Sequence, residues 1–298
     1  MSNSPTSLDP KALRRAFARA AETVAEASFL DREIERRMAE RLGYIRLEPK
    51  RVLDAGAGRG ASVALLRARY PRAEIVATDF APELLCAARS TRSLADRARR
   101  LLGAPPTRFV CADFAALPLA AGSVGLVWSN LALSFSPDPG ASLAEWLRVL
   151  EVGGLAMFTT YGPDTLKELR AAFGAAALTP RVQTFVDMHD LGDLLVGAGF
   201  VDPVMDMEML TLTYEDLATV VRDLRNSGQQ SALASRPRGL TTPRAWQRVV
   251  AAYERQRRDG RLPVTVEVVY GHAWKTAPRR AADGRAIIRF DRPISRRD

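Results

Sequence analysis

The chain has 298 residues, 47% hydrophobic and 26% charged, which is ordinary for a globular protein. It contains no apolar run of the roughly 20 residues that span a bilayer, and its two cysteines, Cys86 and Cys111, offer neither a disulfide framework nor metal-type spacing. The net charge of +9 comes mainly from arginine, but no aromatic residues alternate with the basic ones as a nucleic-acid platform requires.

These features predict a protein that binds no nucleic acid, no membrane and no metal. Residues 1–10 are polar and lack the apolar segment of a secretory signal, so we expect a cytoplasmic location. Residues 1–47 form the first predicted segment, which is helical because apolar residues recur among charged ones at helical spacing.

From Lys50 the pattern alternates between strands and helices, which is typical of a parallel sheet covered by helices on both faces. The predicted strands span residues 52–53, 75–77, 108–112, 124–128 and 154–160, and the intervening helices include 82–100 and 143–150.

The order changes after Tyr161, where the sequence predicts helices at 165–177, 188–198, 214–227 and 243–258 and strands at 207–213 and 264–274. A helical lid is therefore inserted between the last two strands. We divide the chain into an N-terminal segment (1–47), a core (48–213), a lid (214–262), a final core strand (263–275) and a basic tail (276–298).

The most informative run is Val52-Leu53-Asp54-Ala55-Gly56-Ala57-Gly58-Arg59-Gly60, a strand that leads into a glycine-rich turn. Alternate glycines let the backbone bend tightly and approach a ligand closely. No Gly-Lys-Ser or Gly-Lys-Thr follows, and the third glycine comes one residue too early for a dinucleotide fingerprint. Asp54 before the turn would repel a pyrophosphate but attract a cationic cofactor end, such as a sulfonium beside an ammonium. Asp79, after the next strand, is a candidate for binding ribose hydroxyls or for capping a helix.

With these motifs, residues 52–160 resemble the class I S-adenosylmethionine (SAM) methyltransferases. The resemblance implies a Rossmann-like, doubly wound, mostly parallel seven-stranded α/β sheet that binds ligands at the carboxyl ends of its strands. It implies a cofactor site made of Asp54, Gly56, Gly58, Gly60, Asp79, Phe80, Asp113, Phe114 and Ser129. By the same resemblance Trp128 and Asn130 lie beneath the transferable methyl group, although a tryptophan here also suits the core.

A narrower resemblance extends from Phe17 to Trp274, to the malonyl-[acyl-carrier protein] O-methyltransferases of biotin synthesis. It implies methyl transfer from SAM to the free carboxylate of a malonyl thioester, with the acidic acyl-carrier protein as partner. In the lid, Arg222 and Arg225 are candidates to hold that carboxylate. The segments that carry the resemblance are residues 17–21, 128–133, 158–169, 185–192, 210–214 and 267–274.

The same pattern is similar to a SAM-binding relative that acts as a protein-arginine hydroxylase in respiratory-complex assembly. A class I methyltransferase with another small acid as acceptor is a further alternative. The chain departs from the family most clearly at Val24, which stands where the opening motif usually has a tyrosine that helps to close the cofactor site.

Overall fold

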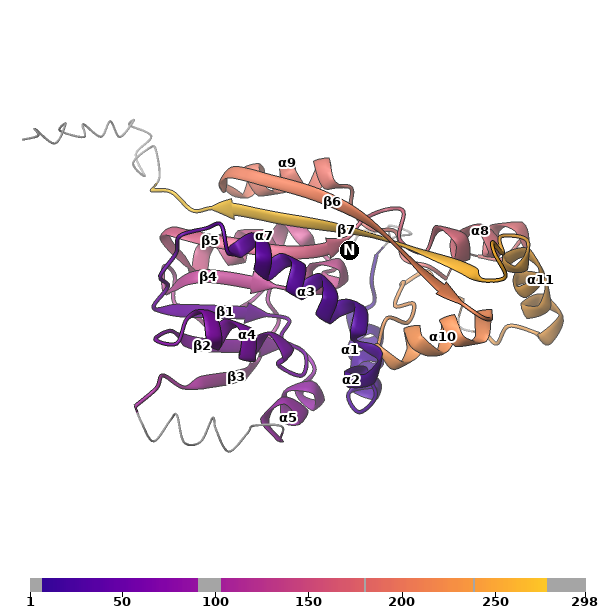
Figure 1. The fold of residues 1–298 in the computed structure, drawn as a ribbon, viewed down its shortest axis with the longest axis horizontal. Coiled ribbons are helices and arrows are strands. Elements are labelled where there is room, and N and C mark those ends of the chain that lie inside the picture. Colours follow the sequence, from indigo (N-terminus) through magenta and orange to yellow (C-terminus); the bar gives the residue numbers. More distant parts are fainter. Residues whose placement is uncertain (1–6, 91–102, 180, 238, 278–298) are drawn as a thin grey trace, which may run out of the picture.

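The computed structural model describes residues 7–90, 103–179, 181–237 and 239–277 (Figure 1). Its centre is one seven-stranded sheet with the order β3-β2-β1-β4-β5-β7-β6. Only the pairings of β7, with β5 and with β6, are antiparallel, so the predicted mostly parallel sheet is confirmed. The strands are β1 (Arg51–Ala55), β2 (Glu74–Asp79), β3 (Thr107–Cys111), β4 (Val124–Ser129), β5 (Leu150–Tyr161), β6 (Val201–Tyr214) and β7 (Leu262–Trp274).

Helices cover both faces of the sheet, because neighbouring residues of a strand point to opposite faces. In β1, Val52 packs in a core cluster with residues of α3 and α4, whereas Leu53 packs in a second cluster with residues of α7 and α9. The strand order reverses between β1 and β4, where an open α/β sheet binds its ligands. Among the described residues, the helices before the lid are α1 (Pro10–Ala20), α2 (Val24–Ala27), α3 (Phe29–Leu42), α4 (Ala61–Arg69), α5 (Pro82–Ser90), the 3-10 turn η1 (Ala132–Phe135), α7 (Pro139–Val149), α8 (Lys167–Ala175) and α9 (Met188–Ala198).

The lid lies beyond one end of the sheet, where β6 and β7 extend as a long antiparallel pair (Figure 1). Between these strands the chain forms α10 (Leu217–Asn226) and α11 (Pro243–Glu254). Helix α8 packs against α11, so residues from the predicted core segment also build the lid. The side-chain amide of Gln256 donates to the Glu168 carbonyl oxygen at 2.9 Å, which ties the two helices together.

Several predicted boundaries differ from the structure by a few residues, and two of these differences have identifiable local reasons. Strand β6 begins at Val201, well before the predicted residue 207, because a register shift between Val201 and Val204 accommodates Pro203. Helix α10 begins at Leu217 because Tyr214 still pairs with Leu262 in the sheet. The helix predicted at 82–100 is described only as far as Ser90, and most of the basic tail lies outside the described residues.

The N-terminal segment is joined to the lid as well as to the core. Leu8 and Leu233 form an antiparallel bridge, and the Asp9 amide donates to the Ala232 carbonyl oxygen at 2.7 Å. Arg236 pairs with the Asp9 carboxylate at 3.0 Å. The segment and the lid therefore cover the carboxyl edge of the sheet together. Within the described parts of the chain, no helix combines the length and apolarity needed to cross a membrane.

Candidate active site

The glycine loop leaves β1 and leads into α4 with left-handed backbone at Gly56, Gly58 and Gly60, where φ is +81°, +53° and +76°. The amides of Gly56 and Ala57 both donate to the Thr78 carbonyl oxygen, at 2.9 and 2.8 Å. A Cβ atom on Gly56 would lie 2.1 Å from that of Ala132, so no larger residue fits there. The loop is therefore held against both β2 and the turn after β4.

Asp79 ends β2 and binds the loop with one carboxylate oxygen and the next turn with the other. Its Oδ2 accepts from the Gly58 amide at 2.9 Å, and its Oδ1 accepts from the Ala81 amide at 2.8 Å. Burial raises the pKa of Asp79 to about 6, against the lowering effect of these hydrogen bonds. The capping role considered for Asp79 is therefore present, and its side chain also faces a pocket.

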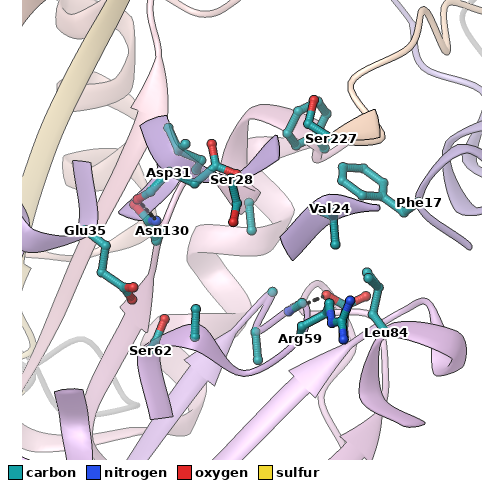
Figure 2. A pocket seen from close by; sticks show the side chains of 18 of the residues that line it. Phe17, Val24, Ser28, Asp31, Glu35, Arg59, Ser62, Leu84, Asn130 and Ser227 are labelled. Atoms are coloured by element: carbon teal, nitrogen blue, oxygen red, sulfur yellow. Dashed lines mark hydrogen bonds between the residues drawn. The ribbon is translucent and has the colours of Figure 1, made fainter. Parts of the chain in front are cut away.

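That pocket, of about 330 Å³, lies at the carboxyl ends of β1, β2 and β4 (Figure 2). Helices α2 and α3 form one wall, and the lid contributes Ser227 and Gln229. Phe17 and Val24 lie on the same side, so the residue at the family's tyrosine position does face the pocket. Of the residues predicted for the site, those that line the pocket are Gly56, Gly58, Asp79, Phe80, Phe114 and Asn130.

The other predicted cofactor residues lie next to the pocket without lining it. Ser129 is buried and donates to the Ala55 carbonyl oxygen at 2.8 Å, which holds the end of β1 where the glycine loop begins. Gly60 forms the N-cap of α4. Asp113 is exposed and accepts from the Ala115 amide at 2.9 Å, while its neighbour Phe114 points into the pocket wall. Asp54 is considered below.

Trp128 does not lie where the resemblance placed it. Its side chain is fully buried in the core cluster that includes α3 and α4 and does not line the pocket. The indole Nε1 donates to Glu35 Oε1 at 3.4 Å. Trp128 thus contacts an acidic pocket residue from the core side, because its side chain points to the face of the sheet that α3 and α4 cover.

Two acidic residues of α3, Asp31 and Glu35, line the pocket and were not predicted (Figure 2). Glu35 is only 5% exposed, and burial raises its pKa, partly offset by hydrogen bonds from Ser62 and Trp128. Burial and the charge of Glu35 raise the pKa of Asp31 to about 6. The sequence does carry a signal for Glu35, because it falls among Ile34, Met38 and Leu42, the buried residues of α3.

Asp54 lies behind this acidic surface. It is 1% exposed, and its Oδ2 has no hydrogen-bond partner in the described structure. Burial, followed by the charges of Glu35 and Asp79, raises the pKa of Asp54 well above its ordinary value. Several carboxyl groups therefore converge on one pocket, which favours a ligand that carries positive charge. In the described part of the chain, no group of three or more His, Cys, Asp or Glu could hold a metal ion.

We expect Asp54→Asn to stabilise the ligand-free protein at about pH 7.5, by roughly 2 °C or more in Tm, because it removes a buried carboxyl group that must take up a proton when the chain folds. With its pKa raised on folding, Asp54 binds a proton in the folded state that the unfolded chain has released, so wild-type stability falls as pH rises through this window. Asparagine is neutral throughout, and the advantage should shrink toward about pH 4, near the unfolded pKa. Thermal unfolding across this pH range is the measurement, and a variant less stable near neutral pH contradicts it.

A second cavity, of about 590 Å³, lies between α8, α10 and the loop after α10. It shares Phe135 and Gln229 with the first pocket, so the two are neighbours. Arg181 and Arg225 line this cavity, and the guanidinium group of neither forms a hydrogen bond or ion pair with any described residue. Arg222, which we also considered, lines neither space. It is exposed and donates to Thr219 Oγ1 at 3.4 Å. Arg236 lines the cavity but already pairs with Asp9.

Known proteins match both the fold and the whole chain. Residues 53–158 match the family model described as a methyltransferase domain. The YcgJ protein of Bacillus subtilis superposes with a TM-score of 0.56 at 14% identity, covering 82% of this chain and 100% of that one, which shows a shared fold.

Two relatives agree over nearly their full length. A malonyl-[acyl-carrier protein] O-methyltransferase of Laribacter hongkongensis (strain HLHK9) is 53% identical over 285 residues, covering 95% of this chain and 96% of the relative. One of Gallionella capsiferriformans (strain ES-2) is 50% identical, with the same coverage. The glycine loop, the fold and this identity agree: the chain is a methyltransferase and belongs to the malonyl-[acyl-carrier protein] O-methyltransferase family.

Proposed function

We propose that the chain transfers a methyl group from SAM to the free carboxylate of a malonyl thioester on acyl-carrier protein, an early pimeloyl-forming step of biotin synthesis. The observation that carries this proposal is the contact between two spaces of opposite character. An acid-lined pocket suits a cationic methyl donor, and a cavity with two unpaired arginines suits an anionic acceptor. They meet at Phe135 and Gln229.

The residues of the first pocket fit SAM. Asp79 is positioned to accept from ribose hydroxyls, and Phe80 and Phe114 provide apolar surface for an adenine ring. Asp31 and Glu35 provide negative charge for the sulfonium and ammonium end, and Asp54 lies next to the pocket with an oxygen that has no hydrogen-bond partner. Asp113 and Ser129 stay in the proposed site as a neighbour of the adenine wall and as support for the loop. SAM supplies a methyl group made electrophilic by a positively charged sulfur.

The acceptor needs no general base, because a carboxylic acid with a pKa near 4 is already ionised at neutral pH. What the protein must supply is position, and alignment of the reacting groups is worth up to about 7–11 kcal/mol. The guanidinium group of Arg181 or Arg225 can bind a carboxylate through two parallel hydrogen bonds. The apolar walls of the cavity, which include Phe173 and Trp246, suit the thioester arm.

Methyl esterification removes the negative charge of the free carboxylate, so that the enzymes of fatty-acid elongation, which act on apolar chains, can accept the product. The carrier protein itself is acidic, and exposed arginines of the lid, among them Arg222, Arg244 and Arg248, offer it a complementary surface. In this role Arg222 binds the carrier protein and does not bind the malonyl carboxylate.

The test is transfer of labelled methyl from SAM to malonyl-carrier protein, measured beside malonyl-CoA and a reaction without acceptor. We expect label on the malonyl group of the carrier, recovered as a base-labile ester. Binding of SAM without transfer to either thioester would overturn the proposal and favour a SAM-binding protein of another activity. Transfer to a different small acid would leave the donor site intact and change only the acceptor.

A further inference from the structure

Asp31 lies where the donor pocket meets a smaller neighbouring cavity. It lies in the first turn of α3 and lines both the donor pocket and a smaller adjoining space that Ser227, Gln229 and Tyr161 also border. Its backbone oxygen accepts from Asn130 Nδ2 at 2.9 Å, and Asn130 Oδ1 accepts from Thr159 Oγ1 at 2.7 Å. These bonds attach the start of α3 to the ends of β4 and β5, so the position of Asp31 is set by the sheet.

The Asp31 carboxylate accepts no hydrogen bond and forms no ion pair within the described residues. The charge of Arg32 lowers the pKa of Asp31 less than burial and the charge of Glu35 raise it. Two arginines line the same pocket, but both bind elsewhere. Arg32 donates to the Ala25 carbonyl oxygen at 2.8 Å and to Ser28 Oγ at 2.7 Å. Arg59 donates to the carbonyl oxygens of Ala21 and Glu22, at 3.0 and 3.3 Å.

The order of residues along the pocket indicates which part of the donor faces Asp31. In the proposed donor site, Asp79 and Phe80 line the end that holds the nucleoside. Glu35 lies beside Ser62 in the first turn of α4, away from the lid (Figure 2). The transferable methyl must face the second cavity, which meets the pocket at Phe135 and Gln229. Because Asp31 borders the small space that also contains Gln229, it lies on the side toward which the sulfur presents its methyl group.

We infer that Asp31 recognises the positive charge on the sulfur, and that this carboxylate lets the pocket distinguish SAM from S-adenosylhomocysteine. The inference rests on the proposed function, since it requires SAM as donor. The methyl group leaves as a cation equivalent, and its departure converts a charged sulfonium into a neutral thioether. The attraction to Asp31 therefore disappears in the product, which weakens product binding relative to substrate binding. Glu35, on the side away from the lid, faces the ammonium group that both ligands carry.

The test is calorimetric binding to the full chain of three ligands: SAM, S-adenosylhomocysteine and sinefungin, in which an amine-bearing carbon replaces the methylated sulfur. The key variant is Asp31→Asn, which keeps the shape of the side chain and removes its charge. A charge-assisted contact is worth about 1.5–3 kcal/mol, so we expect affinity for SAM and sinefungin to fall about 10- to 100-fold. Affinity for S-adenosylhomocysteine should change less than about threefold.

Three further variants make the result specific. Glu35→Gln should weaken SAM and S-adenosylhomocysteine equally. Asp31→Glu, which restores the charge, should recover part of the preference for SAM. Asp190→Asn removes the same charge from exposed α9 and should change no affinity.

Equal loss of SAM and S-adenosylhomocysteine in Asp31→Asn would overturn the inference, and so would unchanged affinity for all three ligands. Failure of the wild type to bind any of the three would instead overturn SAM as the donor, so the two failures are distinguishable.

Discussion

Replacement of Asp79 by asparagine should lower the affinity for SAM by about 100-fold or more, since it removes charged hydrogen bonds worth about 1.5–3 kcal/mol each. Each carboxylate oxygen of Asp79 accepts from a different backbone amide, Gly58 on one side and Ala81 on the other. An asparagine can accept with only one oxygen, and its NH₂ group would face the other amide donor. The variant therefore loses both the predicted ribose contact and one support of the glycine loop. Calorimetric titration with SAM measures the effect.

The chain offers a matched control for this variant. Asp187 caps α9 with the same local geometry, because its Oδ1 accepts from the His189 amide at 2.8 Å, two residues further on. It lies outside the donor pocket, so Asp187→Asn should cost some stability and leave SAM affinity unchanged. An Asp79→Asn variant that binds SAM within about threefold of the wild type would remove Asp79 from the donor site.

Loss of either unpaired arginine of the second cavity should have the other large effect. We expect Arg181→Ala and Arg225→Ala each to lower kcat/KM for the malonyl thioester about 100-fold, because a bidentate guanidinium–carboxylate pair is among the strongest hydrogen-bonded contacts in proteins. SAM affinity should stay unchanged, since neither residue lines the donor pocket. Steady-state kinetics with malonyl-carrier protein, together with SAM titration, separate the two effects.

Arg222→Ala is the control, because Arg222 lies on the same helix as Arg225 and is likewise exposed but lines neither space. It should change kcat/KM for malonyl-CoA little, with any loss confined to the carrier-bound substrate. If Arg222→Ala lowered kcat/KM for malonyl-CoA as strongly as Arg225→Ala, the proposal that the malonyl carboxylate binds the arginines of the second cavity would be wrong.

Some features of this protein follow from short stretches of sequence. Residues 51–61 contain a strand, a glycine turn and the start of a helix in direct succession, so the sequence alone determines the loop and its positive-φ glycines. Asp79 is likewise predictable, since it ends the next strand of an alternating α/β pattern. These contacts are local or lie between adjacent parallel strands, and the predicted mostly parallel, seven-stranded sheet was confirmed with them.

The sequence predicted less well the residues that reach the pocket from distant elements. Asp31 and Glu35 come from a helix before the sheet, and Gln229 comes from the lid. Which of their side chains meet depends on how α3 and α10 pack, and on the bonds that join the N-terminal segment to the lid.

Arg222 and Arg225 show the same limit within one helix. They are three residues apart, yet only Arg225 lines the cavity, because the rotation of α10 is set by its buried residues Leu217 and Val220. Trp128 was misplaced because a strand residue at the carboxyl edge can face either a ligand or a covering helix, and α3 covers it here. The sequence by itself thus determined the fold class and the loop that suits a cationic donor, through contacts between neighbours in the chain. Only the tertiary structure decided which acids surround the donor and which arginines reach the acceptor, because these side chains are brought together by helix packing across the carboxyl edge of the sheet.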